Sequence, residues 1–345
     1  MNRHKWLGLV GLIVLVTGCT SCGGGAPGEQ KGGGPPPLLS PQPATGQKAP
    51  VFQQVRAFAD LEKQCDFGAR IPGSQAHSQC LAWLKTQFPG ASQVFNQDFS
   101  SETPFGGPYD FTNVLALYGA DKPGVPFLIC SHWDSRPKAD RDPVLANRSQ
   151  PVLGANDGAS GVAVILELAR LLQASPPPHP VLLVLLDAED SGKDTSSFNA
   201  YSGFCIGSDY LAKHWPASVP KPAEGVLLDM VGRNDAPNPR ITNPPYGAVP
   251  YLYLPIEGNS IDYNPTLVDA LWTIAEQRGH LAYKRTVGGR ITDDHLPLNA
   301  AGIKVIDIIQ FPPPEWHTID DTPAYCSPAA LEQTGDTLVR YLYGR

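Results

Sequence analysis

The chain has 345 residues, of which 42% are hydrophobic, enough for one large domain with a buried core. Residues 51–345 carry 22 of the 26 basic and 32 of the 33 acidic residues, so their formal net charge is −10. An acidic surface disfavours nucleic acid and anionic lipid, because binding to them depends on Lys and Arg displacing counterions. We therefore expect no nucleic-acid partner.

Residues 1–22 are typical of a bacterial lipoprotein signal. MNRHKW is basic, LGLVGLIVLV is an apolar run that is short for a bilayer span, and VTGC ends at Cys19, the expected lipidation site. An ordinary signal peptide or an N-terminal anchor helix is the alternative. Residues 23–50 are rich in Gly and Pro and predict a flexible tether. The remaining 51–345 would then be a monomeric domain anchored to a membrane in the cell envelope, facing the periplasm or the exterior.

Short apolar runs alternate with amphipathic stretches from Asn113 onward. The runs lack period-2 polarity and predict strands that are buried on both faces: 114–119, 125–132, 181–187, 225–232 and 303–310. Apolar residues at helical spacing predict helices at 158–173, 266–279 and 328–344. This alternation predicts a single α/β domain with a mixed, mostly parallel central sheet flanked by helices.

Five cysteines lie beyond residue 50, and their spacing matches no zinc-finger pattern: Cys65, Cys80, Cys130, Cys205 and Cys326. An envelope location would permit disulfides, and Cys65 and Cys80 are the pair closest in sequence. The odd count leaves at least one thiol unpaired within the domain.

Acidic and imidazole side chains follow the predicted strands, which is where ligands bind in open α/β sheets. His132 ends the second run, residues 187–190 begin at the end of the third, Asp229 lies in the fourth, and His317 follows the last. Asp157 precedes a predicted helix. Each residue also has a structural explanation; Asp157, for example, could cap that helix. Five such junctions together predict one shared site.

A catalytic zinc needs three or four nitrogen, oxygen or sulfur ligands and one open position. Asp157, Asp190 and His317 come from separate loops and supply such a set. The prolines of FPPPEWHTIDD stiffen the approach to His317, so that little entropy is lost when a metal binds. Glu189 precedes Asp190 and can face the open position without binding the metal, where it would act as general acid and base.

The motifs resemble the zinc-aminopeptidase superfamily in their order and spacing: SHWDS (131–135), NDGASGVAVILELAR (156–170), LLDAED (185–190), LLDMVG (227–232), TDDHLPL (292–298) and EWHTIDD (315–321). Within it, the chain is most similar to the animal-type glutaminyl cyclases over about residues 55–343. The resemblance implies a zinc-dependent glutaminyl-peptide cyclotransferase that converts the N-terminal Gln of peptides or proteins to pyroglutamate and releases ammonia. Asp293, at a position where the hydrolases usually have a small or hydroxyl residue, and Trp316 favour the cyclases.

The resemblance also implies roles for individual residues. One zinc per chain is expected on the three ligands named above. Glu189 would move protons, and Asp293 would share a proton with it. Asp229 would orient the substrate amine, and Trp316 would form an aromatic wall. In the two-zinc aminopeptidases of the superfamily, the positions of His132 and Asp229 bind the second metal, so hydrolysis of N-terminal residues is the alternative. A non-catalytic binding scaffold is a third reading, although each expected position carries a competent side chain.

Overall fold

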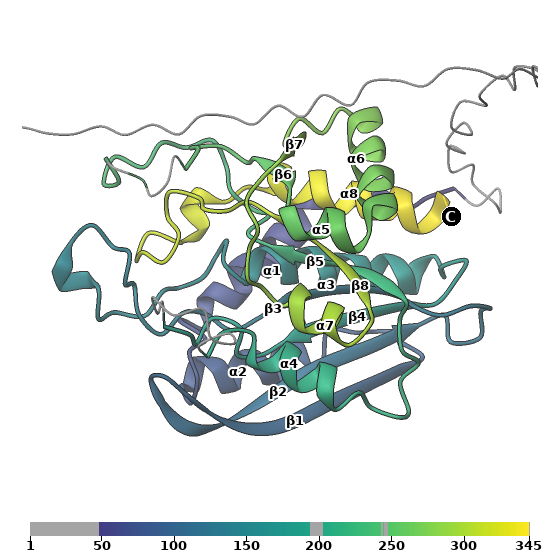
Figure 1. Ribbon diagram of the computed structural model, residues 1–345, viewed down its shortest axis with the longest axis horizontal. Coiled ribbons are helices and arrows are strands. Elements are labelled where there is room, and N and C mark those ends of the chain that lie inside the picture. Colours follow the sequence, from purple (N-terminus) through teal and green to yellow (C-terminus); the bar gives the residue numbers. More distant parts are fainter. Residues whose placement is uncertain (1–47, 194–202, 243, 245–247, 345) are drawn as a thin grey trace, which may run out of the picture. The chain divides into compact units, whose positions relative to one another are not determined.

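The computed structural model describes residues 48–193, 203–242, 244 and 248–344, which form a mixed α/β domain (Figure 1). The predicted lipoprotein signal, with Cys19, and residues 23–47 of the predicted tether lie outside the described residues. No helix within the described ranges is long and apolar enough to cross a bilayer. The central sheet has six strands: β1 (Gln93–Thr103), β2 (Gly106–Tyr118), β3 (Phe127–His132), β4 (Val181–Leu186), β5 (Glu224–Asp229) and β8 (Lys304–Ile309).

The strand order is β1-β2-β4-β3-β5-β8, and the sheet is mostly parallel, as predicted. β4, β3, β5 and β8 pair in parallel, whereas β2 is antiparallel to both β1 and β4. The four parallel strands therefore direct their carboxyl ends to the same edge of the sheet. A second, small parallel sheet consists of β6 (Leu254–Ile256) and β7 (Tyr283–Val287).

Helices cover both faces of the central sheet. The larger apolar cluster includes residues of α1 (Gln54–Asp66), α2 (Gln75–Leu84), α3 (Ala159–Ala174), α6 (Pro265–Arg278) and α8 (Pro328–Gly344). A second cluster includes residues of α4 (Ile206–Lys213) and α7 (His295–Ala300). The remaining short elements are α5 (Gly258–Tyr263) and 3-10 turns at Leu145–Asn147 and Pro323–Tyr325.

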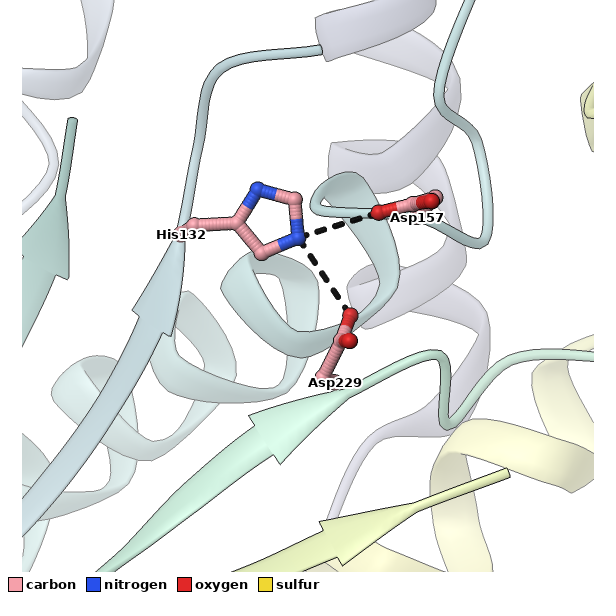
Figure 2. Close-up of side chains that lie close together, drawn as sticks. All are labelled: His132, Asp157 and Asp229. Atoms are coloured by element: carbon pink, nitrogen blue, oxygen red, sulfur yellow. Dashed lines mark hydrogen bonds and ion pairs between the residues drawn. The ribbon is translucent and has the colours of Figure 1, made fainter. Parts of the chain in front are cut away.

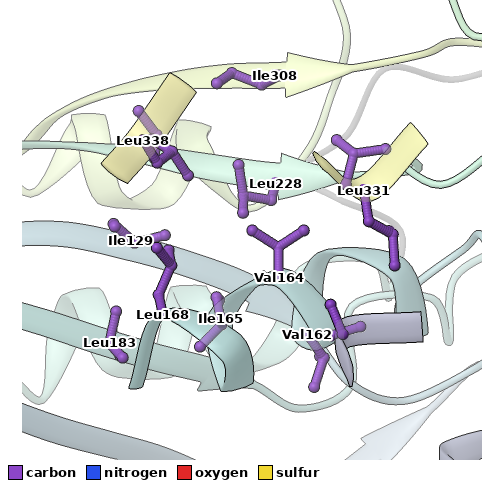
Figure 3. Packing of buried hydrophobic residues seen from close by; sticks show 14 of the residues in the cluster. Ile129, Val162, Val164, Ile165, Leu168, Leu183, Leu228, Ile308, Leu331 and Leu338 are labelled. Atoms are coloured by element: carbon purple, nitrogen blue, oxygen red, sulfur yellow. The ribbon is translucent and has the colours of Figure 1, made fainter. Parts of the chain in front are cut away.

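Burial on both faces explains the continuous apolar runs in the sequence. In β4, Leu183 and Leu185 belong to the larger cluster, whereas Leu182 and Val184 belong to the other. Figure 3 shows Leu183 and neighbouring strand residues packed against apolar side chains of α3. Full burial of each such side chain contributes roughly 1.5–3 kcal/mol, so the β4 strand is fixed from both sides.

Four predicted strands are shorter in the structure, two of them by a single residue at one or both ends: Val181–Leu186 and Lys304–Ile309. The second run begins at Phe127 rather than at residue 125, because Pro126 has no N–H with which to join a ladder. The fourth run ends at Asp229, since Met230 turns the chain with a φ of 49°. α1, α2, β1, α4, α5, β6, β7 and α7 were not predicted. β1 is an edge strand with a mostly polar sequence, so it lacks the apolar signal of the central strands.

All five cysteines of the described domain are buried thiols without a disulfide. Cys65 and Cys80 are therefore not paired. Burial raises the pKa of each of these two thiols to about 12, so they are inert as nucleophiles at neutral pH.

Candidate active site

The parallel strands bring the candidate residues to one edge of the sheet. β3 ends at His132 and β5 ends at Asp229, while the 187–190 turn follows β4. The loop after β8 supplies His317, and Asp157 lies in the turn before α3. Side chains that are far apart in the sequence thus meet at the position expected for ligand binding in this type of sheet.

Asp157, Asp190 and His317 form a buried cluster in which one ligand atom of each residue lies within 4.8 Å of the others. His317 Nε2 is 3.4 Å from Asp190 Oδ1 and 3.9 Å from Asp157 Oδ2. Asp190 Oδ2 is buried and has no hydrogen-bond partner among the described residues, which is costly for a carboxylate oxygen. A divalent cation would satisfy that oxygen. Two carboxylates and an imidazole are a donor set that fits zinc and leaves a position for substrate.

Asp157 does not cap α3. The N-cap position is held by Gly158, and no side chain accepts a hydrogen bond there. Gly158 has a φ of 95°, and an added Cβ would lie only 2.7 Å from Asp134 O, so this turn requires glycine. The backbone N–H of Asp157 donates to Asp321 Oδ2 over 3.0 Å, which fixes the turn from the other side. The carboxylate of Asp157 is thereby directed into the site.

Asp157 also belongs to a second cluster, with His132 and Asp229 (Figure 2). His132 Nε2 lies 3.1 Å from Asp157 Oδ1 and 3.3 Å from Asp229 Oδ1. All three side chains are buried. The two clusters therefore share one carboxylate, and their donor atoms could hold one cation or two.

In the second cluster, the His132 imidazole offsets part of the negative charge of the surrounding carboxylates. Burial opposes protonation of this imidazole, but its contacts with Asp134, Asp157 and Asp229 prevail and raise its pKa well above the usual value. Burial also raises the pKa of Asp229 to about 6, against the opposing effect of His132. A cation held by these residues must therefore displace a proton from the imidazole.

Glu189 faces a second carboxyl group, that of Asp293. One oxygen of each lies within 4.8 Å of the other and of Cys205 Sγ, and the thiol donates a hydrogen bond to Glu189 Oε1 over 3.5 Å. Burial, followed by the neighbouring carboxylates, raises the pKa of both acids well above their usual values. Burial and the neighbouring carboxylates thus favour the protonated form of at least one of these two acids. The contact with Cys205 was not predicted from the sequence.

Arg136 and Asp140 support the metal-ligand cluster and were also missed in the sequence. Arg136 Nη1 donates to Asp190 Oδ1 over 2.7 Å, while its Nε and Nη2 donate to the two oxygens of Asp140 over 2.9 and 2.7 Å. Asp140 Oδ1 in turn lies 3.4 Å from His317 Nδ1. A carboxylate on the remote nitrogen of a ligand histidine fixes the ring and its tautomer. Two of the three candidate ligands are thus held by one buried guanidinium and its partner.

The backbone around the site is strained at several residues. Among the described residues, positive φ angles outside glycine occur at Ala188, Cys205, Met230 and His317. Each lies within the site or next to one of its acids. Such conformations cost of order 1–3 kcal/mol each and persist where the surrounding structure fixes them.

A pocket of about 240 Å³ opens onto these residues. Its lining combines the carboxyl groups of both clusters and His317 with a set of apolar residues: Phe204, Ile291, Ile309, Phe311 and Trp316. The Trp316 ring stacks on His317 with 3.9 Å between ring centroids. Trp316 therefore lines the pocket beside His317.

A comparison with known protein families matches residues 113–342 to Peptidase family M28. The chain belongs to this family. A glutaminyl-peptide cyclotransferase-like protein of Bos taurus is 27% identical over 297 residues, which cover 79% of this chain and 71% of that protein. This M28 chain thus has the fold and relatives that its motifs predicted.

Two solved structures show the same relationship. The crystal structure of Bacteroides thetaiotaomicron glutaminyl cyclase bound to N-acetylhistamine has a TM-score of 0.77 and 31% identity, covering 86% of this chain and 100% of that one. The structure of a Zn-dependent exopeptidase from Parabacteroides distasonis ATCC 8503 has a TM-score of 0.76 and 29% identity, covering 86% and 100%. Together they confirm the resemblance to glutaminyl cyclases within a superfamily of zinc enzymes. One of these neighbours is a glutaminyl cyclase and the other is an exopeptidase, so both activities occur among similar structures.

Proposed function

We propose that this M28 protein is a zinc-dependent glutaminyl-peptide cyclotransferase that acts on peptides or proteins with an N-terminal Gln. The observation that carries the proposal is the carboxyl group of Asp293 beside Glu189. A pair of acids that retains one proton can both accept and donate at neutral pH, as the transfer between an amine and a departing amide nitrogen requires. Similarity to structures of bacterial glutaminyl cyclases supports the same choice.

Asp157, Asp190 and His317 would hold one zinc ion. When bound, zinc would supply Lewis acidity to the γ-carbonyl group of the substrate glutamine. Arg136 and Asp140 would keep Asp190 and His317 in place. The pocket of about 240 Å³ suits a single N-terminal residue, with Trp316 against its aliphatic part.

Glu189 would accept a proton from the α-amine as the amine nitrogen attacks the γ-carbonyl carbon. It would return that proton to the γ-nitrogen, which leaves as ammonia, so one C–N bond forms, another breaks, and no water is consumed. Asp293 would hold the Glu189 carboxyl group through the shared proton, and Asp229 would orient the amine. Both reacting groups belong to one residue, so the enzyme needs chiefly to fold the substrate and stabilise charge.

Aminopeptidase activity with two metal ions is the second candidate function. It is favoured by the complete cluster of His132, Asp157 and Asp229, which could hold a second ion beside the first. In that reading Glu189 would take a proton from water, and the products would be a free amino acid and a shortened peptide.

One experiment separates the two reactions. The purified, zinc-loaded protein is incubated with a Gln-initiated peptide, and the products are analysed by mass and by ammonia release. Loss of one ammonia from an otherwise intact peptide, with one zinc per chain, supports cyclisation. Loss of the whole N-terminal residue, with two metal ions per chain, would show that the enzyme is an aminopeptidase.

We also propose that the domain is anchored in the cell envelope through a lipid on Cys19. The basic, apolar and VTGC segments of residues 1–22 support this proposal. Cys19→Ala is expected to move the protein from the membrane fraction to the soluble fraction. Retention of the variant in the membrane fraction would contradict the lipid anchor.

A further inference from the structure

A second pocket, of about 210 Å³, adjoins the active-site pocket. The two share three lining residues, Ile291, Ile309 and Phe311. The other walls of the second pocket come from the small β6–β7 sheet (Figure 1) and from residues that follow β8. Phe311 is 41% exposed, and its ring contacts Trp316 edge-on with 4.8 Å between centroids. A chain that leaves the active site over Phe311 therefore reaches the second pocket.

The lining of the second pocket mixes apolar and polar groups and offers no unpaired charge. Of the described residues that line it, only Glu257 is charged, and that carboxylate is buried. Its oxygens accept hydrogen bonds from the backbone N–H groups of Asn259, Ser260 and Ile291. The remaining lining combines aliphatic, proline and phenyl groups with the hydroxyl groups of Tyr253 and Thr286 and with the Gln310 amide, whose Oε1 has no hydrogen-bond partner among the described residues. Such a lining suits an uncharged side chain with an apolar body, because a charged one would lose its hydration without gaining a charged partner.

Hydrogen bonds hold the walls of this pocket in place. The buried Gln310 side chain donates through Nε2 to Tyr251 O over 2.9 Å, which ties the segment before β6 to the end of β8. Tyr253 and Thr286 join β6 to β7 through their hydroxyl groups, 2.9 Å apart. A pocket with fixed walls binds without a cost for ordering its own loops.

We propose that the second pocket is a specificity subsite that binds an apolar side chain from the two residues after the N-terminal glutamine. The proposal rests on the proposed function, since it places the N-terminal residue in the active-site pocket. An extended residue spans roughly 3.3–3.6 Å, so the second or third residue reaches a pocket that shares a wall with the first. The preferred substrates are thus peptides with an aliphatic or aromatic side chain at one of these positions.

The test alters the second pocket at Val287, which is 61% exposed and does not line the active-site pocket. Initial rates are measured for glutamine amide, which fills only the active-site pocket, and for Gln-Ala-Ala, Gln-Leu-Ala and Gln-Ala-Leu. For the wild type, kcat/KM is expected to be about tenfold higher for one leucine peptide than for Gln-Ala-Ala. Val287→Asp should reduce that ratio about fivefold while the value for glutamine amide stays unchanged. Val125→Asp is the matched control, because Val125 is 59% exposed and lines neither pocket.

A charge reversal separates a binding effect from damage to the fold. Val287→Lys should raise kcat/KM for the peptide with Asp at the preferred position, whereas Val287→Asp should lower it further. Equal effects of both variants on all substrates, or no effect on the leucine preference, would overturn the subsite while the cyclase assignment stands. If the wild type hydrolyses the peptides instead, the cyclase assignment is wrong, and the same ratios measured for hydrolysis test the subsite. A protein that turns over none of these substrates would refute both proposals.

Discussion

Asp140 offers a sharp test of how this chain holds its metal ligands. Its carboxylate lies 3.4 Å from His317 Nδ1 and accepts two hydrogen bonds from Arg136. Asp140→Asn keeps the shape of the side chain but removes its charge. The amide leaves the His317 imidazole without this charged partner. It also leaves Asp190 as the remaining carboxylate partner of the buried Arg136 guanidinium. We expect zinc affinity to fall for both reasons.

The expected loss follows from the positions of these groups. Removing the carboxylate partner of a ligand histidine typically costs 10–100-fold in metal affinity. The Asp140 side chain is 35% exposed, so water replaces part of its effect on His317. Arg136, by contrast, is fully buried, and it would draw more electron density from Asp190 once its bidentate partner is gone. We therefore expect the zinc Kd to rise about tenfold to thirtyfold, or roughly 1.4–2 kcal/mol.

The assay is competition for zinc against a chelator of known affinity, at pH 8, where protons compete least with the metal. Asp209→Asn is the matched control: Asp209 is 34% exposed and pairs with Lys213 four residues away, much as Asp140 pairs with Arg136, but it lies on α4 outside the pocket lining. A Kd within about twofold of wild type for Asp140→Asn, or an equal rise for both variants, would refute the reasoning.

Three further predictions concern the base, the acids and the turn before α3. Glu189→Gln should lower turnover about 10²–10⁴-fold with zinc still bound, as measured by ammonia release and metal content; unchanged turnover would remove Glu189 from the mechanism. Burial raises the pKa of Asp294 to about 7, so in the metal-free protein the folded state binds this proton more tightly than the unfolded state. The free energy of unfolding should then fall by about 1–3 kcal/mol as pH rises from about 4 to 7, and it should fall by less in Asp294→Asn. Denaturant unfolding measured across this pH range tests the prediction, and a rise in stability would contradict it. Gly158→Ala should destabilise the protein by about 1–3 kcal/mol and weaken zinc binding, because its Cβ would meet Asp134 O. Gly124→Ala has a similar φ of 99° but open space around it, so an equal loss of zinc affinity in this control would contradict the steric argument.

The central strands were predictable because both of their faces are buried in the fold. β4 packs between helices on both faces, and that requires a continuous apolar run, which VLLVLL supplies. The clustering of acids and imidazoles was predictable because parallel strands direct their carboxyl ends to the same edge of the sheet. β1 meets no such demand: it is paired on one side only and exposes alternate residues, so QVFNQDFSSET carries little signal.

Residues that act through other residues were harder to predict. Arg136 and Asp140 lie four positions apart in a loop, and in sequence they are indistinguishable from a solvent-exposed ion pair. Only the folded chain places Asp140 beside His317 and buries the guanidinium against Asp190. The same holds for Cys205, whose thiol contacts Glu189 across 16 positions of the sequence. Local patterns identify groups that need a partner, whereas the identity of that partner is a property of the tertiary structure.

Asp157 explains why the ligands alone do not decide the reaction. It lies in both clusters, so a first cation on Asp190 and His317 uses one of its oxygens while His132 faces the other. A protonated His132 already supplies positive charge between Asp157 and Asp229, and a second cation must replace that charge rather than fill a vacant acidic site. The same residues therefore serve a one-metal or a two-metal enzyme, depending on whether a proton or a metal occupies this position. Beyond the number of metal ions, we expect the choice between cyclisation and hydrolysis to depend on the acid pair of Glu189 and Asp293 and on the apolar residues that line the pocket.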